Sequence, residues 1–193
     1  MDSASADLTE SNPEDWPQEL ESVLFDKETI ARRVAELGAA IARDYDGRPL
    51  VLIAVLKGGI FFLSDLSREI TLPHEFDLVG AQSYKGGTRP TEDITITKDL
   101  DLDIEGKDVL IVEDIYDTGG TLGVIRKMLE IHQPASIEVC ALLNKKKDRT
   151  DRIELKYIGF NIEDVFVVGY GLDYKEKFRN LPCIGVLRPE IYQ

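Results

Sequence analysis

The expected architecture follows from one segment, Val109-Leu110-Ile111-Val112-Glu113-Asp114-Ile115-Tyr116-Asp117-Thr118-Gly119-Gly120-Thr121. Its four leading aliphatic residues predict a strand that is buried on both faces of a parallel sheet. Two carboxylates, Glu113 and Asp114, follow where this strand should reach the surface. A turn of small residues comes next, and apolar residues at helical spacing begin at Leu122. The segment therefore predicts a strand, an acidic edge, a loop of small residues and a helix.

The loop between this strand and this helix has the composition of a ligand site. In open α/β sheets, ligands bind beyond the carboxyl ends of the strands. A helix that begins just after Gly119-Gly120 directs free backbone N–H groups, and about half a positive charge, into the loop. Such a helix start suits a phosphate, whereas carboxylates suit sugar hydroxyls or a metal ion. The loop therefore predicts a ligand that carries phosphate, hydroxyls and Mg²⁺ together, with an ordinary buried strand and acidic turn as the alternative.

Composition limits the classes of protein to consider. The 193 residues suffice for one domain with a sizeable core, and 43% hydrophobic with 31% charged residues is typical of a globular protein. The net charge of −13 repels nucleic acid and anionic membranes, so we expect neither as a partner. The sequence contains no Walker A or Gly-x-Gly-x-x-Gly motif, which argues against kinase and hydride-transfer chemistry.

Cellular context is inferred from what the sequence lacks. No apolar run approaches membrane-spanning length and no signal region opens the chain, so we expect a cytoplasmic protein. Cys140 and Cys183 form no CxxC or zinc-spaced set and lie among apolar residues. We therefore expect both cysteines to be buried, reduced thiols.

The rest of the chain is predicted to alternate between helices and strands. Residues 1–21 are polar and acidic and predict a disordered tail, which leaves 22–193 as a single domain. Asp26 is the expected N-cap of a helix that runs to about Asp44. Further strands are expected at 50–56, 76–84, 94–97, 136–143, 157–160 and 165–170, with a helix after residues 57–59 and a polar hairpin over 85–93.

The segment 113–121 resembles the ribose-phosphate signature of the type I phosphoribosyltransferases, and in particular the branch that acts on hypoxanthine and guanine. The resemblance runs from about Ser22 to Val186 and includes several separate motifs in the correct order. It implies an α/β fold with a central, mainly parallel sheet flanked by helices, a small hood from the chain ends and a β-hairpin lid. It also implies a homodimer or homotetramer, with the first helix and residues 76–83 as candidate contacts.

The resemblance implies a specific reaction. Ribose 5-phosphate is transferred from phosphoribosyl pyrophosphate to a 6-oxopurine, hypoxanthine or guanine, through an oxocarbenium-like state, with Mg²⁺ as cofactor. Glu113 and Asp114 would bind the ribose hydroxyls, one of them through Mg²⁺. Asp117 would be the general base that takes a proton from N7 of the purine. The 5′-phosphate would lie on the backbone amides of Thr118, Gly119, Gly120 and Thr121.

The other motifs of the resemblance lie on separate loops. Lys57-Gly58-Gly59 resembles the family's pyrophosphate loop, in which the bond matching Leu56–Lys57 is a cis peptide, and Arg179 would also bind pyrophosphate. Ser83-Tyr84 resembles the pair near the start of the family's lid, although the lid tip here lacks the usual serines. The residues implied in purine binding are Lys145, which would donate to the C6 oxygen, Phe166, which would stack on the base, Val167, whose backbone would contact the Watson–Crick edge, and Asp173, a further Mg²⁺ ligand.

Some of these residues have simpler interpretations. Lys57-Gly58-Gly59 is also a plain strand-to-helix turn, Phe166 a core residue and the 85–93 hairpin a solvated loop, while Lys146-Lys147 is expected on the surface. A cation at Lys145 favours an oxygen at C6 over the amino group of adenine. Xanthine stays open as a substrate, and so does a different class, an RNA-binding regulator of the same fold, although a net charge of −13 disfavours it.

Overall fold

The computed structural model describes residues 17–83, 94–147 and 153–192. The strands of its central sheet are β2 (Leu50–Leu56), β3 (Glu75–Ser83), β4 (Ile94–Lys98), β5 (Asp108–Tyr116), β6 (Ser136–Lys145) and β7 (Tyr157–Ile162). They lie side by side in the order β4-β3-β2-β5-β6-β7. All neighbouring pairs are parallel except β3 with β4, which is antiparallel. The predicted mainly parallel α/β sheet is confirmed.

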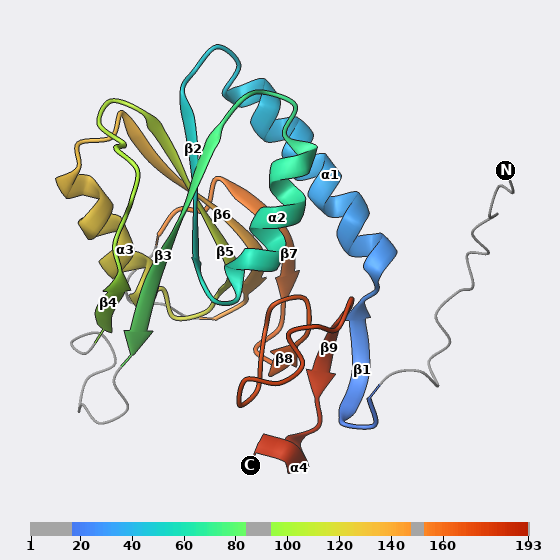
Figure 1. Cartoon of the computed structure of the whole chain (residues 1–193). Helices are drawn as coiled ribbons and strands as arrows, with labels where there is room; N and C mark the ends of the chain where they lie inside the picture. Colours follow the sequence, from blue (N-terminus) through green and yellow to red (C-terminus); the bar gives the residue numbers. More distant parts are fainter. Residues whose placement is uncertain (1–16, 84–93, 148–152, 193) are drawn as a thin grey trace, which may run out of the picture.

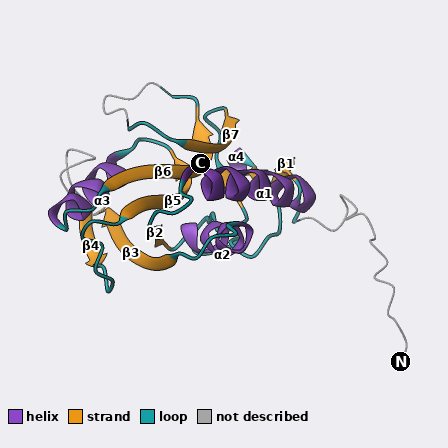
Figure 2. Cartoon of the chain, turned by 90° about the horizontal axis from the view of Figure 1, so that it is seen from above, coloured by secondary structure: helices purple, strands orange, loops and turns teal. Residues whose placement is uncertain are grey.

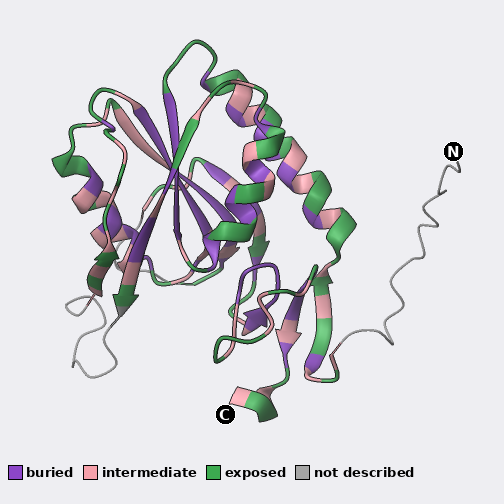
Figure 3. Cartoon of the chain, viewed as in Figure 1, coloured by how far each residue is buried: buried purple, intermediate pink, exposed green. Residues whose placement is uncertain are grey.

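Helices cover both faces of this sheet (Figure 2). α1 (Lys27–Asp44) and α2 (Gly59–Glu69) pack on one face, and α3 (Gly120–Ile131) packs on the other. Leu50 and Leu52 of β2 join the core beneath α1 and α2, whereas Val51 and Ile53 join the core beneath α3. Because both faces are covered, the inner strands must be apolar at consecutive positions. Figure 3 shows the resulting burial along the middle of the sheet.

Helix α1 begins where the sequence predicts. Oδ1 of Asp26 accepts a hydrogen bond from the N–H of Thr29 at 2.8 Å, so Asp26 is the N-cap. The helix ends at Asp44, and its buried side chains are Ile30, Val34, Leu37 and Ile41, all on one face. This amphipathic pattern was the basis of the prediction, and both the cap and the extent of the helix are confirmed.

The two ends of the chain meet in a second, smaller sheet. β1 (Leu20–Phe25), β9 (Ile184–Leu187) and β8 (Val167–Val168) are antiparallel in that order, and the short helix α4 (Pro189–Tyr192) follows β9. This hood lies beyond the carboxyl ends of the parallel strands (Figure 1). The predicted hood is confirmed. Leu20 and Glu21, which the sequence placed in the tail, belong to β1, and residues 1–16 lie outside the described residues.

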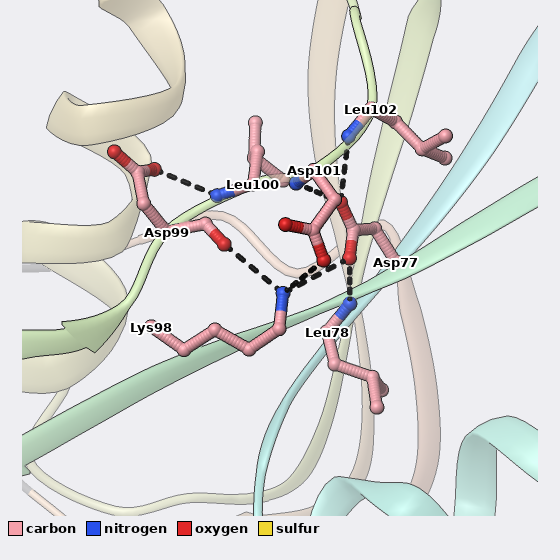
Figure 4. A network of polar contacts seen from close by, with 7 residues as sticks. All are labelled: Asp77, Leu78, Lys98, Asp99, Leu100, Asp101 and Leu102. Atoms are coloured by element: carbon pink, nitrogen blue, oxygen red, sulfur yellow. Dashed lines mark hydrogen bonds and ion pairs between the residues drawn. The ribbon is translucent and has the colours of Figure 1, made fainter.

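Strands β3 and β4 form the predicted hairpin, whose tip, residues 84–93, lies outside the described residues. The connection from β4 to β5 is tied to β3 by the buried carboxylate of Asp77 (Figure 4). Asp77 accepts hydrogen bonds from the amides of Leu78, Asp101 and Leu102 at 2.7, 2.7 and 3.0 Å, and from Nζ of Lys98 at 3.3 Å. Burial opposes ionisation of Asp77, but these donors outweigh it and hold its pKa below the usual range.

Several elements differ from the expectation. The predicted strand at 109–112 continues as β5 to Tyr116, because its pairing with β6 extends past the two carboxylates. β8 has two residues rather than the predicted six, since Gly169 and Gly171 take positive φ values of 100° and 98° and turn the chain away. β9 and α4 were not predicted. Among the described residues, no helix is long and apolar enough to cross a membrane.

Candidate active site

Glu113 and Asp114 lie side by side near the carboxyl end of β5. Glu113 lines a small cavity at the start of α3, whereas the Asp114 carboxylate lies against the α-carbon of Gly58, in the loop after β2. The predicted acidic edge therefore serves two loops, one on each side of β5.

Burial changes the titration of both acids. Glu113 is buried, and its Oε2 has no hydrogen-bond partner among the described residues. Burial, and then the negative charge of Asp114, raises the pKa of Glu113 well above its usual range. Burial also raises the pKa of Asp114 to about 6, although the amide of Ile115 and the charge of Arg179 act in the opposite direction. A ligand that donates hydrogen bonds or carries positive charge would stabilise the ionised forms of both acids.

The loop from Asp117 to Thr121 has the geometry of an anion site. Gly119 has a φ of 86°, in the left-handed region that favours glycine, and it is the N-cap of α3. Because glycine has no side chain, the first amides of the helix have no cap side chain to which they could donate. They border a cavity of about 70 Å³, which is lined by Glu113, Ile115, Tyr116, Asp117, Thr118, Gly119, Thr121 and Leu122.

Asp117 and Lys145, expected to act on the purine, meet at the ends of β5 and β6. Nζ of Lys145 lies 3.4 Å from Oδ2 of Asp117. Lys147 also reaches this carboxylate, with Nζ 3.3 Å from Oδ1, and Asp164 contacts both lysines. Lys147 is exposed, as predicted, but the contact of its ammonium with Asp117 was not foreseen from the sequence. The alternate spacing of the two lysines is the sequence signal for this.

The loop after β2 approaches β5 closely. The bond between Leu56 and Lys57 is cis, as the family resemblance implied. Residue 58 has no room for a side chain, because a Cβ there would overlap the Asp114 carboxylate. Gly171 is equally restricted, because its own Cβ would overlap the carbonyl oxygen of Gly58. Three backbone segments thus converge at the carboxyl end of the sheet, and two of them require glycine.

Lys57 and Arg179, both expected to bind pyrophosphate, lie in one cluster with Glu176 and Asp173. Oε2 of Glu176 lies 3.0 Å from Nζ of Lys57 and 3.4 Å from Nη2 of Arg179. The same Nη2 lies 2.7 Å from Oδ1 of Asp173, and Nη1 donates to the carbonyl of Gly171 at 2.7 Å. An adjoining cavity of about 380 Å³ is lined by Leu56, Lys57, Gly80, Ala81, Gln82, Thr97, Glu176 and Arg179.

Phe166 and Val167 lie in the hood at the start of β8. The Phe166 ring stacks on Tyr192 of α4, with centroids 4.8 Å apart and planes 21° apart, and meets the edge of Tyr174 at 5.7 Å. Val167 is buried, and its strand pairs with β9. The stack with Tyr192 was missed, because nothing local in the sequence links residues 166 and 192. Ser83 ends β3, and Tyr84 lies outside the described residues.

The acidic side chains of the site offer oxygen ligands that suit Mg²⁺. This ion takes oxygen ligands and is usually held by one or two carboxylates together with substrate phosphates. In the described part of the chain, no three acidic, histidine or cysteine side chains gather as a metal group. Asp173 is already engaged by Arg179 and by the amide of Glu176, whereas Glu113 keeps a buried carboxylate oxygen beside the helix start. These residues fit a magnesium ion that arrives with a phosphorylated substrate rather than a cage made by protein alone.

The carboxyl end of the parallel sheet thus combines an acidic edge, a glycine-capped helix start and a lysine–aspartate pair. The sequence matches the family described as "Phosphoribosyl transferase domain" over residues 22–175. The chain belongs to the phosphoribosyltransferase family. The resemblance from which the site residues were inferred is therefore confirmed at the level of the family.

Members of this family resemble the chain over most of its length. A hypoxanthine-guanine phosphoribosyltransferase of Staphylococcus aureus strain Mu50 is 48% identical over 174 residues, 90% of this chain and 97% of the relative. One from Mycobacterium avium is 43% identical over 196 residues, 98% of this chain and 97% of the relative. The crystal structure of a hypoxanthine phosphoribosyltransferase from Staphylococcus aureus has a TM-score of 0.87 at 47% identity, covering 91% of this chain and 95% of that chain.

Proposed function

We propose that this phosphoribosyltransferase acts in purine salvage, transferring ribose 5-phosphate from phosphoribosyl pyrophosphate to hypoxanthine or guanine. The products would be IMP or GMP and pyrophosphate. The observation that carries the proposal is the pair of Asp117 and Lys145, 3.4 Å apart, directly beside the glycine-capped start of α3. A 6-oxopurine needs a donor for its C6 oxygen and an acceptor for the proton on N7, and this pair supplies both beside a phosphate site.

The phosphate and ribose groups of the substrate would lie along β5. The amides of Thr118 to Thr121 would bind the 5′-phosphate, which suits a helix start whose cap residue has no side chain. The carboxylates of Glu113 and Asp114 would accept hydrogen bonds from the 2′- and 3′-hydroxyls. Burial raises the pKa of each acid, so both gain from a ligand that donates to them.

Pyrophosphate would leave on the side of β5 that faces the loop after β2, away from the 5′-phosphate at the start of α3. Lys57 and Arg179 offer two cations there, beside a cavity of about 380 Å³, and the glycine at 58 keeps the backbone open for a close approach. Mg²⁺ bound by the ribose-side carboxylates and the substrate would neutralise the charge of the departing diphosphate. Asp173 would help to hold a second position for the ion, and Phe166 and the backbone of Val167 would contact the base.

Asp117 would take the proton from N7 while N9 bonds to C1′ of the ribose. General base catalysis of this kind contributes about 10²–10⁴-fold to the rate. Lys145 would orient the base by donating to the C6 oxygen, which an adenine ring does not offer. A cytoplasmic homodimer or homotetramer is proposed on the family resemblance alone.

An assay with phosphoribosyl pyrophosphate, Mg²⁺ and each of five bases tests the proposal. Hypoxanthine and guanine are expected to be converted, with adenine and uracil inert, and xanthine is the competing 6-oxopurine. Conversion of adenine alone, or of none of the five, would overturn the assignment. Filter binding with RNA at low salt tests the second class of function, the non-catalytic regulator, and no retention is expected from a chain of net charge −13.

A further inference from the structure

Lys147 and Asp164 have no part in the site as proposed above, yet both contact it. Asp117, Lys145, Asp164 and Lys147 form a closed ring of ion pairs, which we call the charge ring. Nζ of Lys145 lies 3.4 Å from Asp117 and 3.3 Å from Asp164. Nζ of Lys147 lies 3.3 Å from Asp117 and 3.2 Å from Asp164. Two positive and two negative charges alternate around it.

The ring holds each carboxylate by both of its oxygens. In Asp117, Oδ2 faces Lys145 and Oδ1 faces Lys147. In Asp164, Oδ1 faces Lys145 and Oδ2 faces Lys147. A single partner leaves a carboxylate free to turn about its Cβ–Cγ bond, whereas two partners on different oxygens define its plane. The orientation of the Asp117 carboxylate plane matters because a proton acceptor must direct one of its oxygens at the proton on the purine.

The two sides of the ring are also held together by the chain around them. The amide of Lys146 donates to the carbonyl of Ile162 at 2.8 Å, and its Nζ lies 2.7 Å from Oε1 of Glu163. The pair of Lys146 and Glu163 lies next to the ring in sequence but outside it in contacts, and both side chains are well exposed. It therefore provides a matched control for the ion pairs of the ring.

We propose that Lys147 and Asp164 are positioning residues for the transfer reaction. Lys147 holds the plane of the Asp117 carboxylate. Asp164 keeps the ammonium of Lys145 at the site when Asp117 turns to the purine, because it offers that ammonium a second carboxylate. Asp164 lies two residues before Phe166, so the ring also links the purine-stacking strand of the hood to the end of β6. This inference rests on the proposed function.

Steady-state kinetics of full-length variants test the charge ring. Lys147→Met and Asp164→Asn are each expected to lower kcat/KM for hypoxanthine about three- to tenfold, while KM for phosphoribosyl pyrophosphate changes less than about twofold. Lys147→Arg keeps the charge and is expected to retain most of the activity. The control Lys146→Met removes the neighbouring, more exposed cation, which lies outside the ring, and is expected to match the wild type. Melting temperatures of all four variants report whether each one folds.

The double variant Lys147→Met/Asp164→Asn separates a ring from two independent surface charges. Lys147 and Asp164 contact each other and share the neighbour pair Asp117 and Lys145, so the double variant is expected to lose less activity than the product of the two single losses. Losses that multiply, or a Lys147→Met variant as active as Lys146→Met, would overturn the inference. A wild-type enzyme that turns over no purine refutes the proposed function instead, so the two failures are distinguishable.

Discussion

The α-carbon of Gly58 lies so close to the carboxylate of Asp114 that a methyl group on residue 58 would occupy the space of Oδ2. The loop after β2 and the last part of strand β5 therefore share one tight contact at the carboxyl end of the sheet. Gly171 completes it, because a side chain at that position would overlap the carbonyl oxygen of Gly58. The position of the Asp114 carboxylate thus depends on a glycine more than fifty residues away in sequence.

Gly58→Ala is expected to displace Asp114 and so to weaken the binding of phosphoribosyl pyrophosphate and of IMP by about tenfold or more. Calorimetric titration with IMP and the KM for phosphoribosyl pyrophosphate measure this. Gly123→Ala is the matched control, since a Cβ at that helical position meets nothing within 4 Å. The control should keep wild-type kinetics and gain about 0.5–1 kcal/mol in stability. Unchanged IMP affinity in Gly58→Ala would contradict the importance of this contact.

Asp117→Asn is expected to lower kcat by about 10²–10⁴-fold with a modest change in KM, because an amide cannot accept the N7 proton. Pre-steady-state or steady-state turnover of hypoxanthine measures the effect. Asp46→Asn, an exposed carboxylate in the turn after α1, serves as the control and should be fully active. Turnover at the wild-type rate would remove Asp117 from the role of general base.

Gly119→Val is expected to change substrate affinity rather than the chemical step. At a φ of 86°, a β-branched residue costs roughly 1–2 kcal/mol. Relief of this strain shifts the loop amides, so KM for phosphoribosyl pyrophosphate should rise. The kinetic constants of Gly119→Val and Asp117→Asn are measured side by side. Gly119→Val should raise KM, whereas Asp117→Asn should lower kcat. The same pattern of kinetic constants in both variants would argue against a phosphate site at these amides.

Asp77→Asn is expected to reduce the free energy of unfolding by about 1–3 kcal/mol at pH 7, because a buried carboxylate that accepts four hydrogen bonds loses its charge. The folded pKa of Asp77 is below its unfolded value, so its contribution is complete above about pH 4 and is lost as the pH falls through the folded pKa. The difference between wild type and variant should therefore shrink below about pH 4.

Urea denaturation of both proteins at several pH values between 3 and 7 measures this dependence. Asp99→Asn is the control: its carboxylate lies in the same network region but accepts a hydrogen bond from the amide of Leu100 rather than touching Asp77 (Figure 4). It should change stability by about 0.5 kcal/mol or less. A difference between Asp77→Asn and wild type that stays constant across this pH range would show that the charge is not the cause.

Tyr192→Leu is expected to weaken purine binding about three- to tenfold, because the Phe166 ring loses the aromatic partner against which it stacks at 4.8 Å. Tyr192→Phe keeps the ring and should behave as the wild type. KM for hypoxanthine and KM for phosphoribosyl pyrophosphate are measured for both variants, and only the first should change. Equal effects on the two constants would indicate a general loss of hood structure.

The local pattern of the sequence was sufficient for the elements that depend on nearby residues. Asp26 and Thr29 are three residues apart, so the start of α1 could be predicted from its cap, and the aliphatic run at 109–112 predicted a strand covered on both faces. Gly119 and Gly120 marked the start of α3 for the same reason. The end of β5 was misplaced, because its last residues are held by β6, and a strand end set by a neighbour leaves no local signal.

The sequence by itself determined a parallel α/β domain, the helix start that suits a phosphate and, through its motifs, the family of the chain. Only the tertiary structure decided that Lys147 and Asp164 close a ring around Asp117 and Lys145, that Gly58 sets the place of Asp114 and that Tyr192 backs Phe166. The physical reason is the range of the forces involved. Helix caps and alternating burial act between residues a few positions apart, whereas ion pairs, steric exclusion and ring stacking act between side chains that only the folded chain brings into contact.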